Sequence, residues 1–576
     1  MKRFFKSMAI ILSCVFICTA FAAADTGTEY VAKDPDAEDT AQEWSSLKAD
    51  YINGLYLTLS VDGAEVSLSS GDIYLTDEGT FLFSEEILTE AFGCAVNVYD
   101  ETSVKILKGS VLVSADIGSA SAEAQSGTIE ITSCIEYING VLYIPEEVLT
   151  DCLGFTGGID TAALTAEYFS ANEDLSILPS YYSSADYGRL PSVKNQGSFG
   201  ACWALAAVSA IEANLLPETD VQLSADHIIY NNGFGTAGES GGDQIMSMSY
   251  LLSWKGPVYE ADDPYGDGKT DDTLEAVYHV QEIQYIASGD FEAIKEAVMK
   301  YGAVETALYI ATIDGIYIDD RHYNYSEAAY CCSESGNAVN HEVIIIGWDD
   351  DYPAENFEGD VTEDGAFICL NSWGDGFGDE GVFYVSYEDA YIGTSNVAYT
   401  VIESADNYDN IYQYDDVGWT ANIGYGKNKA YMANVFTAGA DEVLSAAGFY
   451  ATGEDTSYEV YVITDYEDES SLSITGQVYA SGTLENAGYY TITLSEEVEL
   501  EEGESFAVIV MVDTTGEGKP LACEMDTQTE RTSTITTSGK QSYISSGGSS
   551  WECTQDEYGA NVCVKAYTRL KTDQEE

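Results

Sequence analysis

Cys202 stands where a helical pattern begins, a position that favours a reactive thiol. In LPSVKNQGSFGACWALAAVSAIEANLLP, apolar residues recur at helical spacing from Cys202 to Leu215, and Pro217 ends the pattern. A sulfur at the first residue of a helix faces the positive end of the helix dipole, which favours the thiolate that attacks carbonyl carbon. Taken alone, the same pattern fits equally well a small buried thiol that packs a core helix.

Three further polar residues extend this chemistry. Gln196 lies on a glycine-bearing loop six residues before Cys202, where its amide can donate to an oxyanion. His341 opens the apolar run of NAVNHEVIIIGWDD and is a candidate base. Asn371 follows another apolar run, so its oxygen can orient the imidazole while Trp373 screens that bond from water. A satisfied core histidine and a plain Asn-Ser-Trp-Gly turn explain single pieces, but the combination predicts nucleophilic cysteine chemistry.

The elements that position these groups belong to a long and strongly acidic chain. Its 576 residues exceed what one hydrophobic core organises, which predicts two to four domains. A hydrophobic fraction of 45% and 43 tyrosines argue against disorder. The formal net charge of −77 excludes nucleic acid as a partner, because the chain would repel phosphate. We interpret the acid as a solvated extracellular surface, with specific cation binding as the alternative.

The N-terminus has the layout of an export signal. Residues 1–24 carry three basic residues, then the apolar run AIILSCVFICTAF, then three alanines before Asp25. A lipoprotein anchor through Cys14 or Cys18 fits its neighbouring residues poorly. No later stretch approaches 18 consecutive apolar residues, so we expect no transmembrane segment in the mature chain. The sequence therefore predicts a protein that is secreted, extracellular or associated with the cell wall.

A duplicated unit follows the signal. Residues 25–49 read as an acidic linker, and residues 50–160 as a small α+β module. Within the module, GTFLFSEEILTEAFGC at Gly79 returns 61 residues later as GVLYIPEEVLTDCLGF at Gly140, each copy reading as a strand followed by a short helix. The pattern resembles the repeat named after the N-terminal domain of copper amine oxidases, an accessory unit of exported bacterial proteins. It contains no histidine, so it has no imidazoles for a copper site.

The remaining chain divides into a linker and two larger domains. Residues 161–175 are a linker or prosegment, and residues 176–402 alternate helical and strand signals around every catalytic motif. Residues 408–570 contain alternating runs such as SFAVIVMV, which predict a β-sandwich, and residues 571–576 are a polar tail. Segments such as NIYQYDDVGWT, AYMANVFTA and QSYISSGGSSW resemble the lectin-like domain that follows the peptidase in some clostridial cell-wall cysteine proteases. The resemblance does not specify the ligand of this domain, for which we expect a cell-wall or glycan ligand.

The segment 178–399 resembles the papain family in the order and separation of cysteine, histidine and asparagine. The resemblance implies a two-lobed peptidase, with a helical lobe and a β-barrel-like lobe, within a multi-domain α+β protein. It makes Gln196 the oxyanion donor, Cys202 the nucleophile, His341 the base and then acid, and Asn371 the orienting residue. It further implies four substrate-binding residues, namely Gly241, Gly242, Asn340 and Trp373. A resting thiolate and imidazolium pair is expected.

Departures from the family concern a disulfide and not the chemistry. Typical members link two cysteines at the places held here by Phe199 and Glu239. Both are missing together, so we interpret the bridge as lost as a unit, with Phe199 packing in its place. Ala201 stands where serine is commoner. The cysteines are too sparse for a disulfide-dependent scaffold, and their pairing is not assigned.

We therefore expect a secreted cysteine endopeptidase that acts on proteins or peptides through a Cys202 thioester and is made as a zymogen. One alternative is a catalytically silent surface binding protein, an adhesin or lectin, on a peptidase scaffold. Another is a transglutaminase-like acyl transferase, whose usual third group is a carboxylate where this chain has Asn371. No cofactor is required. The acidic loop 262–272 reads as solvated, and calcium in the final domain is left open because no motif supports it.

Overall fold

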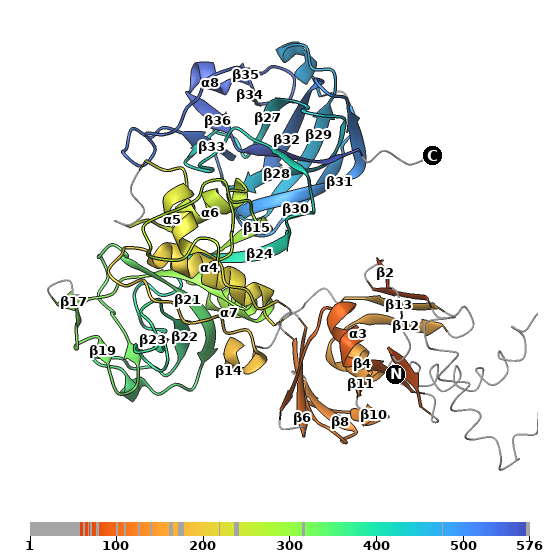
Figure 1. The fold of residues 1–576 in the computed structure, drawn as a ribbon, viewed down its shortest axis with the longest axis vertical. Coiled ribbons are helices and arrows are strands. Elements are labelled where there is room, and N and C mark those ends of the chain that lie inside the picture. The colour runs from red at the N-terminus through yellow and green to blue at the C-terminus, as the bar shows by residue number, and fades with distance from the viewer. Residues whose placement is uncertain are drawn as a thin grey trace, which may run out of the picture. The chain divides into compact units, whose positions relative to one another are not determined.

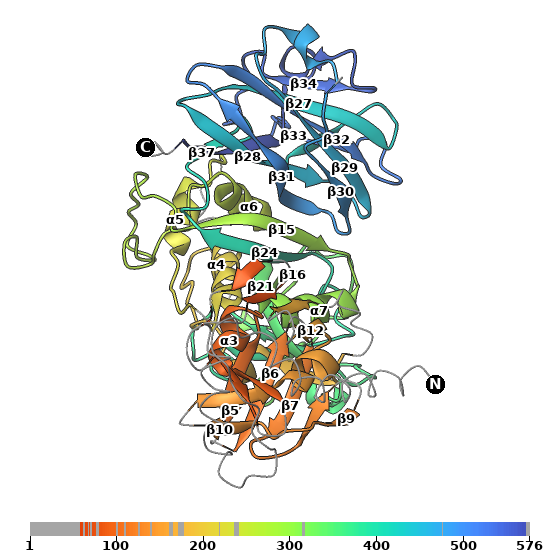
Figure 2. The ribbon, with the colours of Figure 1, turned by 90° about the vertical axis from the view of Figure 1, so that its right-hand side faces the viewer.

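A computed structural model gives the arrangement of the chain (Figures 1 and 2). It describes residues 58–571, except for residues 62–63, 67, 69–71, 77–79, 100–101, 109–110, 125–126, 139–140, 161–164, 171–177, 218, 236–240, 314–316 and 475. The signal at 1–24, the linker at 25–49, most of 161–175, Glu239 and all but the first residue of the polar tail therefore lie outside the described residues. The chain divides into two compact units, Met1–Pro179 and Ser180–Glu576.

The first unit contains the duplicated module. Its strands are β1 (Thr58–Val61), β2 (Ala64–Val66), β3 (Ile73–Leu75), β4 (Phe81–Ser84), β5 (Ala95–Tyr99), β6 (Ser103–Lys108), β7 (Val111–Asp116), β8 (Ser121–Ala124), β9 (Gly127–Glu130), β10 (Glu136–Ile138), β11 (Val141–Pro145), β12 (Thr156–Asp160) and β13 (Thr165–Phe169). Among the described residues they form sheets of order β12-β13-β1-β2, β10-β11-β4-β3 and β5-β6-β7-β8-β9.

The two copies of the repeat pair with each other. Strand β4 leads into α3 (Glu85–Glu90), which Ser84 caps by accepting from the Ile87 N–H, and β11 leads towards the π-helical turn η1 (Val148–Cys152). Strands β4 and β11 are antiparallel neighbours, with Phe83 opposite Ile144. Each copy is thus a strand followed by a short helix, as the repeat predicts. The likeness to the copper amine oxidase module stays a prediction.

The second unit begins with the helices that carry the candidate site. These are α4 (Cys202–Leu215), α5 (Ala225–Asn231), α6 (Gln244–Leu252) and α7 (Phe291–Tyr301), with the 3-10 turns η2 (Ser184–Tyr187) and η4 (Ala354–Asn356). Helix α4 is apolar on nearly every side, which suits a helix buried all round. Trp203, Val208 and Ile211 are fully buried in it, and both views show α5 and α6 between α4 and the C-terminal strands (Figures 1 and 2).

One sheet runs through the whole second unit. Its strands in the first half are β14 (Tyr181–Ser183), β15 (Tyr278–Ile286), β16 (Val304–Leu308), β19 (Tyr323–Asn324), β20 (Ala329–Tyr330), β21 (His341–Asp349), β22 (Ala366–Leu370), β23 (Val382–Ser386) and β24 (Asn396–Ser404), with the separate hairpin β17 (Thr312–Ile313) and β18 (Tyr317–Ile318). The order β19-β20-β23-β22-β21-β16-β24-β15 continues as β31-β28-β37-β25, because β15 pairs with β31.

The C-terminal half is the predicted β-sandwich. Its strands are β25 (Asn410–Tyr412), β26 (Ala421–Ile423), β27 (Lys429–Thr437), β28 (Glu442–Ala451), β29 (Thr456–Ile463), β30 (Ala480–Leu484), β31 (Gly488–Leu500), β32 (Ser505–Asp513), β33 (Leu521–Met525), β34 (Ser542–Ser545), β35 (Glu552–Cys553), β36 (Ala560–Val562) and β37 (Val564–Leu570), with η5 (Glu469–Leu472) and α8 (Thr554–Glu557). The sheet β30-β29-β32-β27-β34-β35 packs on β31, β28 and β37 through a core that includes Leu444, Phe449, Val508 and Val510. The sandwich is joined edge to edge with the preceding domain by the shared sheet.

Three further expectations can be followed in the described residues. Phe199 packs edge-on against Tyr265, with ring centroids 6.2 Å apart, and lies against the core around α4. The ten described cysteines are all free. In the described part of the chain, no helix has the length and apolar character that crossing a bilayer demands.

Candidate active site

The sulfur of Cys202 lies against the strand that carries His341. Cys202 is the first residue of α4, and the backbone N–H of Glu342, the residue after His341, lowers the pKa of its thiol. Burial raises the pKa of the Cys202 thiol, while the backbone N–H groups of Glu342, Trp203 and Cys202 itself lower it. The fold therefore brings together two residues that are 139 positions apart in the sequence.

The imidazole of His341 is oriented by Asn371. His341 is only 6% exposed, and its Nε2 lies 2.8 Å from Oδ1 of Asn371. The same Oδ1 accepts from the backbone N–H of Ser372 at 2.7 Å, which identifies it as the oxygen because a backbone N–H can only donate. Nε2 must then carry the proton in the neutral ring, so Nδ1 is left as the acceptor.

The ring of Trp373 lies beside the imidazole of His341. Its ring centroid lies 4.7 Å from that of His341, with the planes tilted by 37°. Burial lowers the pKa of His341 to about 4, and the hydrogen bond to Asn371 offsets only part of that shift. Burial thus favours the neutral thiol and the neutral imidazole. The thiolate and imidazolium pair expected from the sequence requires the mutual attraction of the two charges to outweigh that burial.

The side chain of Gln196 is held with its NH2 end fixed. Its Oε1 accepts from the hydroxyl of Ser372 at 2.8 Å and from the indole N–H of Trp373 at 3.1 Å. An indole nitrogen only donates, so the opposite end of the amide is the donor. One of its N–H groups donates to the carbonyl of Phe199 at 2.8 Å. Gln196 is therefore tied to the segment that follows Asn371 and points a second N–H elsewhere.

Gly242 of the glycine pair packs against Trp203, the residue after Cys202. Gly241 has a φ of +126°, which other residues rarely adopt. A Cβ at Gly242 would come within 2.4 Å of Cε2 of Trp203, whose side chain is fully buried. Position 242 therefore accepts no side chain as long as Trp203 keeps its place.

The replacement Gly242→Ala should destabilise the second unit by about 1–3 kcal/mol, because the added methyl group overpacks against Trp203. The shift of the backbone at position 242 should also raise KM for peptide substrates. Urea denaturation and steady-state kinetics measure the two effects. Gly376→Ala is the matched control, since no atom lies within 4 Å of a Cβ added there. Equal behaviour of both variants would contradict the packing argument.

Asn340 has a structural task that the sequence did not indicate. Its Oδ1 accepts from the N–H of Ile310 at 2.8 Å, and its Nδ2 donates to the carbonyl of Ile310 at 3.1 Å. The exposed side chain thereby ties the start of β21 to the segment after β16. Its role as a substrate-binding residue stays a prediction.

A buried carboxyl pair lies beside Cys202, and the sequence did not predict it. Glu305 on β16 is fully buried and Glu342 is 7% exposed. The hydroxyl of Tyr399 donates to Oε2 of Glu305 at 2.8 Å, whereas Oε1 of Glu305 and Oε2 of Glu342 have no other donor among the described residues. Burial raises the pKa of Glu305 to about 7, and burial together with the charge of Glu305 raises the pKa of Glu342 well above its ordinary value. The two carboxyls therefore share a proton at neutral pH.

Across the described residues, no three His, Cys, Asp or Glu side chains converge as metal ligands would. In the loop 262–272, Asp263 accepts from Thr270 and Asp271 accepts from Thr273, so these carboxylates serve the loop itself. Calcium in the final domain remains an open expectation.

Comparisons with known protein families match two segments of the chain. Residues 178–402 match the family described as papain family cysteine protease, and residues 411–568 match the lectin-like domain. Among curated proteins, cathepsin S of Bos taurus is 29% identical over 214 residues, which cover 35% of this chain and 59% of that protein. Cathepsin S of Mus musculus is 30% identical over 218 residues, covering 35% of this chain and 57% of that protein. The chain thus spans less than two thirds of the length of these relatives.

Solved structures match over a larger part of the chain. The cysteine protease and lectin-like domains of Cwp84, a surface layer associated protein of Clostridium difficile, align with a TM-score of 0.59 and 27% identity, covering 69% of this chain and 90% of that one. A structure of clostridial Cwp84 after propeptide cleavage aligns with the same TM-score and identity, covering 68% of this chain and all of that one.

Proposed function

We propose that this chain is an exported cysteine endopeptidase, because residues 178–402 match the papain family cysteine protease and residues 411–568 match the lectin-like domain. It hydrolyses peptide bonds in protein or peptide substrates. The observation that carries the proposal is the 2.8 Å hydrogen bond between His341 and Asn371, on the strand whose Glu342 N–H lowers the pKa of the Cys202 thiol.

The reaction uses the geometry of four side chains. The sulfur of Cys202 attacks the scissile carbonyl carbon while its proton passes to Nδ1 of His341, which Asn371 keeps in the accepting tautomer. The carbonyl oxygen becomes an oxyanion and accepts from the Cys202 backbone N–H and the second N–H of Gln196. His341 then protonates the departing amine as the C–N bond breaks. Water hydrolyses the thioester and returns the thiol.

The working place of the enzyme is proposed to be the outside of the cell. The signal layout of residues 1–24 supports export, and the similarity to Cwp84, a surface layer associated protein, supports a position at or near the cell wall. The lectin-like domain is the part that would bind a wall or glycan ligand there.

Activation by cleavage is proposed as well. Cwp84 is described after propeptide cleavage, and in this chain the segment 157–177 precedes the protease domain. We place the activating cut near Leu178. A chain that begins at Asp25 should react more slowly with a peptide substrate than one that begins at Leu178, and equal rates would remove the zymogen from the proposal.

A peptide-library digest with the wild type and Cys202→Ala tests the activity. We expect the wild type to cleave peptides and to gain the mass of one epoxysuccinyl or iodoacetamide group at Cys202. Cys202→Ala should do neither, whereas Cys553→Ala, a half-buried cysteine of the sandwich, should keep the activity. A wild type that neither cleaves nor forms an adduct would favour the binding role without catalysis.

A further inference from the structure

Helix α6 connects the glycine pair, Gly241 and Gly242, to the β-sandwich. Its N-terminal cap is Asp243, whose Oδ1 accepts from the N–H of Ile245 at 3.0 Å. The cap directly follows Gly242, which packs on Trp203 next to the nucleophile. The position of the α6 N-terminus therefore sets the position of the glycine pair.

A loop of the sandwich forms hydrogen bonds with this cap. Arg531, between β33 and β34, donates from Nη2 to Oδ1 of Asp243 at 2.5 Å and from Nη1 to Oδ2, a bidentate pair that joins residues 288 positions apart. Its guanidinium also lies 4.8 Å from the ring centroid of Phe234. The carbonyl of Arg531 accepts from the N–H of Gly235 at 2.9 Å, and the hydroxyl of Thr534 donates to the carbonyl of Gly233 at 2.8 Å.

The loop that carries Arg531 thus contacts the chain on both sides of the glycine pair. Residues 233–235 lie before it and Asp243 lies after it. The contact combines a charge-assisted hydrogen-bonded pair, a cation–π contact and two bonds to the backbone. Such a combination fixes geometry better than a single exposed ion pair does.

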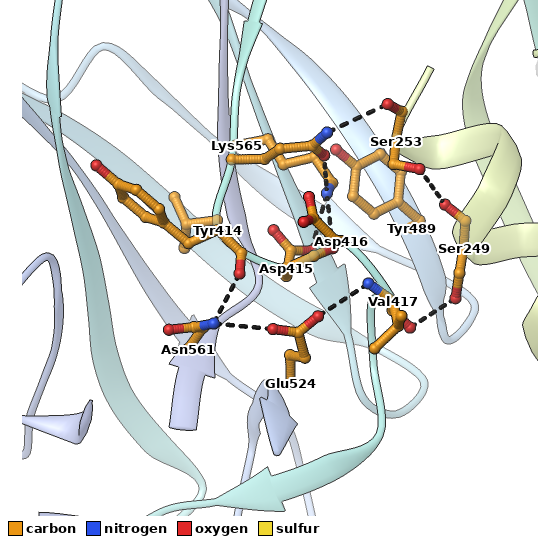
Figure 3. A network of polar contacts seen from close by, with 12 residues as sticks. Ser249, Ser253, Tyr414, Asp415, Asp416, Val417, Tyr489, Glu524, Asn561 and Lys565 are labelled. Atoms are coloured by element: carbon orange, nitrogen blue, oxygen red, sulfur yellow. Dashed lines mark hydrogen bonds and ion pairs between the residues drawn. The ribbon is translucent and has the colours of Figure 1, made fainter. Parts of the chain in front are cut away.

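The C-terminal part of α6 is held by the segment that enters the sandwich (Figure 3). Ser249 donates to the carbonyl of Val417 at 2.6 Å, and Gln413 donates to the carbonyl of Ser253 at 3.2 Å. Lys255, just past the helix, donates to the carbonyl of Asp416 at 3.4 Å. Both ends of α6 are therefore attached to the C-terminal domain.

That entering segment is itself fixed inside the sandwich (Figure 3). Glu524 accepts from the N–H of Val417 at 2.9 Å and from Nδ2 of Asn561 at 2.8 Å. Lys565 forms a fully buried ion pair with Asp415 at 2.9 Å. The segment that contacts α6 is therefore fixed in position, because Glu524, Asn561 and Lys565 lie on the buried strands β33, β36 and β37.

From this geometry we propose that Arg531 is a positioning residue of the protease, which acts through Asp243 on the glycine pair that binds the substrate backbone. The inference rests on the proposed function. It makes the lectin-like domain a part of the peptidase cleft, in addition to any ligand that the domain binds. Loss of Arg531 leaves Cys202 intact, but it lets the glycine pair that aligns the substrate move.

The replacement Arg531→Met in the full, activated chain tests the proposal. We expect KM for a peptide substrate to rise about tenfold with little change in kcat, because a displaced glycine pair aligns the substrate backbone less well. The rate at which iodoacetamide alkylates Cys202 should stay unchanged, because this small probe does not need the glycine pair to bind. Arg531→Lys should recover only part of the loss, since lysine cannot form the bidentate pair. Lys540→Met, which removes an exposed ion pair to Asp556 within the sandwich, is the control.

A double-mutant cycle with Asp243→Asn separates positioning from general damage. Asparagine still caps a helix but lacks the charge, so Arg531→Met should have almost no further effect on KM in that background. An equal tenfold loss in both backgrounds, or an unchanged KM in Arg531→Met, overturns the proposal.

Hydrogen–deuterium exchange provides a readout that does not need activity. Amides of residues 233–235 and 241–245 should exchange faster in Arg531→Met than in Lys540→Met. If the wild type proves inactive, the proposed function fails while this measurement still decides the role of Arg531: unchanged exchange in that segment refutes it.

Discussion

The replacement His341→Ala should lower kcat/KM for peptide hydrolysis by about 10⁴-fold or more, which is the scale of removing a member of such a catalytic unit. The reason is geometric: Nε2 of His341 is tied to Asn371 at 2.8 Å, so Nδ1 is the acceptor available to the thiol of Cys202 beside it. Steady-state kinetics on a cleaved peptide measure the loss. Asn371→Ala should cost less, on the order of 10²-fold, because it orients the base and does not exchange the proton.

A matched histidine variant controls for damage to the fold. His322, which contacts the carbonyl of Cys331 at 3.1 Å, lies in the same domain outside the site, so His322→Gln should keep its activity within a few-fold. The labelling rate of Cys202 by iodoacetamide should fall in His341→Ala and not in His322→Gln. More than a tenth of the wild-type activity in His341→Ala would mean that another group removes the proton.

The local part of this site follows from the sequence. The helical pattern that starts at Cys202 and the apolar strand that starts at His341 are both present with those first residues. Short-range periodicity and a glycine loop are enough for this, because each depends on neighbours along the chain. The carboxyl pair is different. Glu305 and Glu342 meet only because β16 and β21 pair with Ala307 opposite Glu342, and no local pattern specifies that register.

Contacts between domains were beyond the sequence for the same reason. The chain reads as a peptidase followed by a separate sandwich, yet β15 pairs with β31 and Ile283 lies opposite Tyr489. The Arg531 and Asp243 pair joins residues 288 positions apart, each of which looks like an ordinary surface charge. Periodicity reports which face of an element is buried, but not which distant element covers it.

The carboxyl pair predicts how stability depends on pH. The folded pKa of Glu305 is raised to about 7 and that of Glu342 is raised as well, whereas unfolded glutamates titrate near 4.5. A raised folded pKa gives a contribution to stability that is complete below about pH 4.5 and is lost as the pH rises through 7. We therefore expect the free energy of unfolding to fall by about 3 kcal/mol between pH 4.5 and pH 8 through Glu305 alone.

The replacement Glu342→Gln should remove most of that dependence, because the amide N–H can donate to Glu305 in place of the shared proton. Urea denaturation at pH 5 and pH 8 measures the change, and Glu454→Gln, at an exposed position, accounts for the general effect of losing one acid from a chain of net charge −77. The same variant should react faster with iodoacetamide above pH 7, since a second charge on the pair opposes the Cys202 thiolate. If Glu342→Gln and Glu454→Gln lose stability equally between the two pH values, the carboxyls do not share a proton, and Glu305 must find its donor elsewhere.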